Sequence, residues 1–170
     1  TWRMAVFKVR PDSQVWTEAS SSLHAISGEA SGIEGRVDAQ VTAGKLEPAS
    51  LKARIELGVD RLRSGNPLYD AALRRVADAS RYPTISGETS SVTVDGDGSL
   101  RVTGDLTFHG VTRTVDGQVT IEVVDDRTIV IEGDHVFDVT DFGVKPPRIA
   151  MLRVHPDVRV RIRVVAERQE

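Results

Sequence analysis

The stretch LRVTGDLTFHGVTRTVDGQVTI, residues 100–121, decides the fold class of this chain. Apolar or small residues alternate with polar ones along its two halves, 100–108 and 115–121. A period of two places one row of side chains on the buried face of a strand and the other row in water. Residues 109–113, which include Gly110, form the short connection between the halves. The stretch therefore predicts a β-hairpin within an antiparallel sheet.

The same alternation continues on both sides of this hairpin. The short connections carry turn-forming residues, such as Ala43-Gly44 and the DGDG segment at 95–98. About eight strands joined in this way predict an all-β fold, a single antiparallel up-and-down barrel, because closure removes the exposed sheet edges. A sandwich would need longer crossing connections and stays open as the alternative. Strands are predicted near 4–9, 14–27, 33–41, 51–59, 83–94, 99–108, 113–124, 128–139 and 151–166.

One helix interrupts the strands. Asn66 is a good N-cap, and Pro67 suits the first helical position. A spacing of three and four then places four apolar residues on one face: Leu68, Ala72, Leu73 and Val76. A single short amphipathic helix among so many strands is most simply a lid at one end of a barrel. No second domain is indicated, so residues 1–170 are expected to form one.

The composition excludes several classes of protein. A chain of 170 residues with 39% hydrophobic residues can bury one core, and its net charge of -3 argues against nucleic acid as the main partner. Without cysteine there is no disulfide, thiolate chemistry or cysteine-ligated metal. No apolar run is long enough for a transmembrane segment, and no signal peptide is visible. The sequence begins at Thr1 rather than methionine, which indicates a trimmed N-terminus and leaves the compartment, cytoplasmic or exported, open.

Four segments in order along the chain resemble the YceI-like family of bacterial lipid-binding proteins. They are GDLTFHGVTRTV at 104–115, LRSGNPLYDAALRR at 62–75, SRYPTI at 80–85 and FDVTDFGV at 137–144. The resemblance extends from about residue 15 to residue 166. Ala77-Asp78 and Ser86-Gly87 stand where typical members carry aromatic residues, so the chain resembles a divergent branch.

The resemblance implies a lipocalin-like barrel with a long apolar pocket. In this family the pocket holds a polyisoprenoid chain, such as an isoprenoid quinone or a prenyl diphosphate, or another long-chain amphiphile. It implies no catalysis, and neither a cofactor nor a metal is expected.

The barrel interior is the first candidate site. Plain core packing is the alternative for each residue there, since a barrel either fills its interior or leaves a cavity. The strand alternation, the helix face and the late loop together place these side chains in the candidate ligand site: Ile55, Leu57, Leu68, Leu73, Ile85, Leu106, Phe108, Val119, Ile121, Phe137, Phe142, Val160 and Ile162.

Basic residues near the helix end of the barrel form a second candidate site. Guanidinium and ammonium groups at a pocket mouth suit an anionic head group such as a diphosphate, while ordinary surface charge is the alternative. The candidates are Arg63, Arg74, Lys145 and Arg148. A further row, Arg159, Arg161 and Arg163, is expected on the outer face, paired with acids such as Glu132 or Asp134 on a neighbouring strand.

The histidines carry no metal-binding spacing. His24, His109, His135 and His155 are far apart in the sequence, and no pattern such as H-E-x-x-H is present. His109 lies in the predicted hairpin turn, where we expect it to be solvated.

These observations predict a non-enzymatic protein that binds, sequesters or transports a long-chain apolar lipid, a polyisoprenoid first of all. The helix and the loop at 142–151 would gate one end of the barrel. Two other functions stay open. An enzyme acting on a hydrophobic substrate in the same cavity would need polar groups inside, such as His24 or His135 beside an acid. A stress or interaction protein would have a filled barrel. Homodimerisation also stays open.

Overall fold

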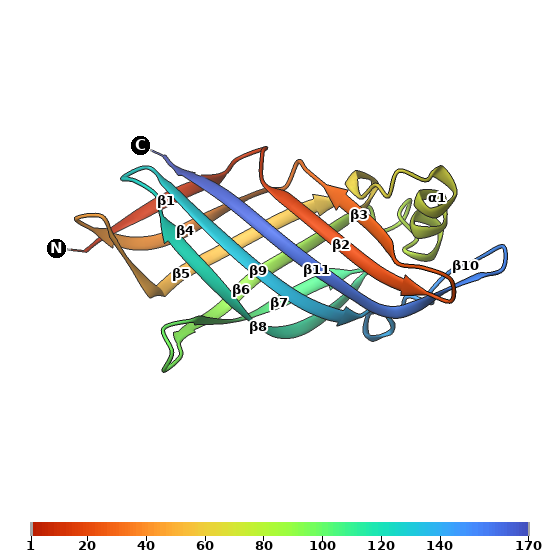
Figure 1. The fold of residues 1–170 in the computed structure, drawn as a ribbon. Helices are drawn as coiled ribbons and strands as arrows, with labels where there is room; N and C mark the ends of the chain where they lie inside the picture. Colours follow the sequence, from red (N-terminus) through yellow and green to blue (C-terminus); the bar gives the residue numbers. More distant parts are fainter. Residues whose placement is uncertain (1, 170) are drawn as a thin grey trace.

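A computed structural model describes residues 2–169 and shows a long antiparallel β-barrel with a helix at one end (Figure 1). β1 begins and β11 ends at the end opposite α1 (Figure 1). The strands are β1 Arg3–Val9, β2 Gln14–Ser21, β3 Ile26–Ala30, β4 Glu34–Thr42, β5 Lys45–Gly58, β6 Thr84–Val94, β7 Leu100–Phe108, β8 Val111–Val123, β9 Thr128–Asp138, β10 Arg148–Ile149 and β11 Leu152–Arg168. The helical elements are η1 Val59–Arg61, α1 Pro67–Val76 and η2 Val139–Phe142.

Eight strands close the barrel. They pair in the order β1-β4-β5-β6-β7-β8-β9-β11, and β11 pairs with β1 to complete the ring. From β4 to β9 each strand pairs antiparallel with the next one in the chain. The predicted antiparallel barrel is therefore confirmed. The β2–β3 hairpin continues the wall beyond β1, because β2 pairs with β11 along the part that β1 leaves free.

The prediction of a single strand near 14–27 is wrong. The chain turns after Ser21 and returns as β3, which pairs antiparallel with β2. The Ser21 hydroxyl closes this turn by accepting hydrogen bonds from the backbone N–H groups of Leu23 and His24, at 3.3 and 3.1 Å. A serine side chain thus stabilises a turn that contains neither glycine nor proline, the residues that usually mark a turn in a sequence.

The hairpin predicted at 100–121 is present, with a tighter turn than expected. Pairing of β7 with β8 reaches Phe108 opposite Val111, so only His109 and Gly110 lie in the turn. Both have positive φ, 56° and 71°, as a two-residue turn of this kind requires. Arg113 therefore belongs to β8, where it lies opposite Leu106 rather than in the connection.

The two ends of the barrel are packed differently. Away from α1 the interior is filled by one cluster of buried side chains: Ala5, Phe7, Val37, Leu51, Val92, Leu100, Ile129 and Ala166. A second cluster forms where the β2–β3 hairpin leaves the ring and includes Val9, Val15 and Ile33. A barrel of ~8 strands is just wide enough for side chains to fill it or for one small ligand to enter. This barrel is filled at one end and hollow toward the other.

The predicted helix is present and is held by a polar network at its start. The Asn66 side chain accepts a hydrogen bond from the N–H of Leu68 at 2.9 Å, and Pro67 occupies the first turn. Ser64 donates to one oxygen of Asp70 from both its hydroxyl and its backbone N–H, at 2.7 and 2.9 Å. These bonds fix the direction in which the chain enters α1 and explain the SGNPLYD segment in structural terms.

The outer arginine row is partly paired as predicted. Arg159 on β11 donates through Nε to Asp134 on β9 at 2.9 Å, and its second nitrogen reaches the other carboxylate oxygen. These hydrogen bonds hold the pKa of Asp134 below its usual value. Arg161 instead lies over the ring of Trp16, 5.4 Å from its centroid. The row therefore stabilises the outside of the sheet.

Replacing Gly110 by alanine is expected to destabilise the barrel by about 2 kcal/mol or more. The residue has φ 71°, and a Cβ there would lie 2.5 Å from the Tyr82 ring. Gly44 provides the matched control, because its φ is 78° but a Cβ would meet nothing within 4 Å. Gly44→Ala should therefore show only the cost of the positive φ. Urea unfolding of both variants measures the difference, and equal losses would mean that the Tyr82 contact carries no weight.

Candidate functional site

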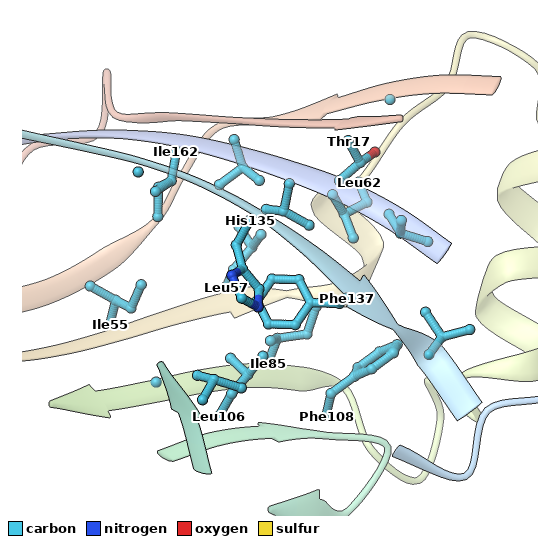
Figure 2. Close-up of a pocket in the computed structure, with 18 of the residues that line it drawn as sticks. Thr17, Ile55, Leu57, Leu62, Ile85, Leu106, Phe108, His135, Phe137 and Ile162 are labelled. Carbon is cyan, nitrogen blue, oxygen red and sulfur yellow. The ribbon is translucent and has the colours of Figure 1, made fainter. Parts of the chain in front are cut away.

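The hollow end of the barrel holds a cavity of about 520 Å³. Its wall is almost entirely carbon, and side chains from opposite strands point toward one another across it (Figure 2). The cavity runs between the filled end of the barrel and α1, since its lining includes Leu51 at one limit and Tyr69 and Leu73 of α1 at the other. This volume lies within the range of about 300–1,000 Å³ that is typical of small-molecule sites.

The strand alternation explains why this wall is apolar. Ile55 and Leu57 come from β5, Ile85 from β6 and Leu106 from β7, each separated from the next inward residue by an outward one. Pairing between adjacent strands keeps these inward rows aligned. On β5 and β6, for example, Leu57 lies directly opposite Ile85. The result is a continuous apolar surface made by every strand around the cavity.

Two glycines on the inward phase make the cavity wider. A Cβ built on Gly117 would meet only the Nδ1 atom of His135, at 3.6 Å, and one on Gly87 would make ordinary contacts of 3.6–4.0 Å with Ile55, Leu106 and the carbonyl oxygen of Asp105. Side chains would fit at both positions without moving backbone. Because glycine has no side chain, the interior keeps this space open at both positions.

All but one of the apolar candidates named from the sequence line this cavity. Leu68 is the exception: it is 69% exposed and does not belong to the lining. It lies in the first turn of α1, five residues before Leu73, and at 3.6 residues per turn the two side chains point about 140° apart, so Leu73 faces the interior and Leu68 does not. The residues in the lining are Ile55, Leu57, Leu73, Ile85, Leu106, Phe108, Val119, Ile121, Phe137, Phe142, Val160 and Ile162.

The sequence reasoning missed the part of the wall that comes from the β2–β3 hairpin. Val15, Thr17 and Ala19 of β2 and Ile26 of β3 all line the cavity. Their alternation is visible in the sequence, but the undetected turn at Ser21 concealed that two strands share it. His135 was also not assigned to the wall, although it follows the same alternation as Phe137 on β9.

His135 is a polar group in this apolar wall. Its ring packs edge-on against Phe137, with centroids 4.6 Å apart, and both rings lie in the middle of the cavity view (Figure 2). Within residues 2–169 no hydrogen bond reaches its side chain. A bound molecule would therefore meet ring nitrogens that no protein group satisfies.

The η2 segment covers the mouth of the cavity beside α1. Phe142 is 3% exposed and packs edge-on against Phe108, with centroids 6.0 Å apart. The β7–β8 hairpin holds this segment: the His109 ring contacts the carbonyl oxygen of Phe142 at 3.0 Å, and Arg113 donates to that of Asp141 at 2.8 Å. The expectation that His109 is merely solvated is therefore wrong, because its ring is half-buried and bonded.

The basic candidates divide into two groups. Arg63 belongs to the cavity lining, and its backbone pairs with Glu29 of β3 through two hydrogen bonds of 3.0 Å. Arg74, Lys145 and Arg148 are exposed and lie outside the lining. Only Arg63 is thus placed to meet a polar group at the cavity edge.

Other kinds of site find no support among residues 2–169. No group of three or more histidine, aspartate or glutamate side chains is arranged to hold a metal ion there. His24 instead contacts Tyr69, and His155 lies 3.1 Å from the Ser20 hydroxyl. In the same residues no helix has the length and apolar character needed to cross a bilayer.

Comparison with known proteins agrees with this architecture. BcnA of Burkholderia cenocepacia is 20% identical, with a TM-score of 0.75 over 90% of this chain and 95% of that one. A polyisoprenoid-binding domain from Saccharophagus degradans is 14% identical, with a TM-score of 0.75 over 98% of this chain and 100% of that one. The Campylobacter jejuni YceI protein is 17% identical, with a TM-score of 0.66 over 85% and 86%. At these identities the likeness concerns the fold.

The sequence itself gives the family. No curated protein matches the chain. The model of the YceI-like domain matches residues 7–166, which includes every strand of the barrel ring in whole or in part and all of the cavity lining. The chain therefore belongs to the YceI-like family.

Proposed function

We propose that this protein binds a long-chain apolar lipid, a polyisoprenoid, in the barrel interior and carries or sequesters it without chemical change. The observation that carries the proposal is the apolar cavity of about 520 Å³ in a barrel whose other end is packed solid. The name of the Saccharophagus degradans relative, a polyisoprenoid-binding domain, supports the same ligand class.

Desolvation of the lipid tail supplies the binding energy in this proposal. Each methylene group that leaves water contributes about 0.8 kcal/mol, so a dry channel needs few polar contacts to bind a long chain. The aromatic and aliphatic walls from β5 to β9 and β11 would surround that chain. The branched methyl groups of an isoprenoid suit a wall that is widened at Gly87 and Gly117.

The ligand would enter at the helix end. The opposite end is closed by buried side chains such as Phe7 and Leu100, whereas η2, β10 and α1 cover the helix end. Among the strands, β10 makes the most contacts with α1, and these are few. Elements held by few contacts open at low cost, so we assign the gate to α1 and the segment at 142–151.

The two rival functions are less well supported. A filled barrel does not account for the cavity. Catalysis in the same cavity would use a hydrogen-bonded group of polar side chains, yet within residues 2–169 no hydrogen bond joins His135 to an acid, and His24 is exposed at the β2–β3 turn. His135 fits better as a hydrogen-bonding partner for one polar group of the ligand, such as a quinone oxygen.

Native mass spectrometry of the protein purified without detergent is expected to reveal a copurified lipid. Adding a prenylated quinone to the emptied protein should give a one-to-one complex and raise the melting temperature, because a ligand at a hundredfold excess over its Kd stabilises by about 2.7 kcal/mol. A hydrophilic quinone without the tail is the control and should bind far more weakly. A protein that is always empty and that no prenyl lipid stabilises would refute the proposal.

A further inference from the structure

The helix end of the barrel exposes three large apolar side chains on three separate segments. Met151 in the β10–β11 turn is 87% exposed, Leu23 in the β2–β3 turn is 71% exposed, and Leu68 in α1 is 69% exposed. These are the largest exposed fractions of the bulky apolar residues that the structure describes. Apolar side chains gathered in water indicate a surface that another body covers.

Direct contacts join the three segments into one surface. Ser22 donates from its N–H to the carbonyl oxygen of Arg153, and Arg153 donates from its N–H to the Ser22 hydroxyl, both at 2.9 Å. The His24 and Tyr69 rings lie 6.4 Å apart, and α1 touches β10. Figure 1 shows α1, β10 and the β2–β3 turn at the same end of the barrel. We call Leu23, Leu68 and Met151 the apolar rim.

The rim lies within a positively charged end of the molecule. Segments 59–82, 109–113 and 139–154, which build this end together with the β2–β3 turn, carry nine Lys or Arg and four Asp or Glu. The whole chain has a net charge of -3, so the remainder of the molecule is acidic. Arg74, Lys145 and Arg148 are exposed at this end and lie outside the cavity lining. Such a distribution orients the protein toward an anionic surface.

We infer that the apolar rim docks on a lipid bilayer that contains anionic head groups. Three side chains from three segments insert into the interface, as interfacial protein segments do to a depth of about 5–10 Å, while the surrounding cations contact head groups. The inference rests on the proposed function, because this orientation turns the cavity mouth toward the lipid that the cavity would receive. The charge and the proximity of the cavity favour a membrane over a protein partner.

Vesicle co-flotation tests the inference. The full chain is expected to bind vesicles of phosphatidylcholine mixed with phosphatidylglycerol, to bind pure phosphatidylcholine weakly, and to lose affinity as salt is raised. Met151→Glu and Leu68→Glu should each weaken partition about tenfold, since one apolar contact becomes a charge. Val124→Glu is the matched control: Val124 is 52% exposed in the β8–β9 turn, at the other end of the barrel, and its variant should bind like the wild type.

The outcomes separate docking from lipid binding. Native mass spectra of the rim variants should still show any lipid that the wild type retains, because neither residue lines the cavity. Vesicle binding without any retained or added lipid would leave docking in place and refute the proposed function. Three results would each overturn the docking inference: no vesicle binding by the wild type, an equal loss of vesicle binding in Val124→Glu, or an apolar rim buried in a dimer that does not bind vesicles.

Charge reversal in a Lys145→Glu/Arg148→Glu variant should remove the preference for vesicles that contain phosphatidylglycerol. A preserved preference would contradict the role of these cations in docking.

Discussion

Replacing Gly117 by phenylalanine is expected to weaken binding of a long-chain lipid about a hundredfold. The new ring would occupy space that takes about four methylene groups of the ligand, each worth about 0.8 kcal/mol. Gly117 lies on β8 opposite Val102, on the face that lines the cavity. A Cβ there meets only His135 Nδ1, at 3.6 Å, so the ring has no route other than into the cavity.

The same substitution should leave the barrel folded. No backbone atom blocks the new Cβ, in contrast to Gly104, where a Cβ would lie 2.6 Å from the carbonyl oxygen of Glu88. Filling a void also restores van der Waals contacts that its lining lacks. Urea unfolding should therefore give a stability equal to or above that of the wild type. A variant that loses binding and stability together would show damage to the wall rather than occlusion.

Thr120→Phe is the control for this variant. Thr120 is exposed on the same strand, opposite Glu132 of β9, and its side chain points away from the cavity. It adds a similar ring to the outside of the barrel and should leave the affinity unchanged. Titration of a prenylated quinone followed by intrinsic fluorescence or calorimetry compares the two. Equal affinities of Gly117→Phe and wild type would place the lipid outside this cavity.

The sequence predicted the fold well because the signals of this fold are local. Alternation with period two fixes which side chains face inward, and the inward assignment of Leu106 and Phe137 needs nothing beyond it. Asn66 and Pro67 mark the start of α1 by chemistry that acts within one turn. The turn at Ser21 escaped detection because a side-chain hydroxyl closes it, and serine in a polar segment has many other roles.

What the sequence could not show depends on contacts between distant segments. The apolar face of α1 is about 140° wide between Leu68 and Leu73, and only the contact with the barrel decides that Leu73 lines the cavity while Leu68 faces water. His109 acquires its partner from residue 142, far along the chain. Whether a barrel is hollow depends on the fit of inward side chains at each level. Alternation places Phe7 and Phe137 alike on the inside, yet one fills a core and the other lines a void.

Alanine substitutions of these two phenylalanines should therefore differ in their effects on stability. Phe7 is 2% exposed within the filled end, so Phe7→Ala is expected to cost about 3–5 kcal/mol of the free energy of unfolding. Phe137 packs on one side against His135 and borders the cavity on the other. Phe137→Ala should cost only about 1–2 kcal/mol, because fewer contacts are lost and a void already exists beside it. Urea unfolding of the empty protein measures both values.

The stabilisation that added lipid gives to each variant should also differ between the two ends of the barrel. The Phe7→Ala variant keeps its cavity wall, so added prenyl lipid should stabilise it by the same increment as the wild type, about 2.7 kcal/mol at a hundredfold excess over Kd. Phe137→Ala enlarges the cavity and removes an aromatic contact. The stabilisation of this variant by the same lipid should therefore be smaller than that of the wild type, and a bulkier lipid should restore it. Equal stability losses in the two variants would mean that the helix end packs as tightly in solution as the closed end. A barrel of that kind has no room for a chain, and the binding proposal would fail with it.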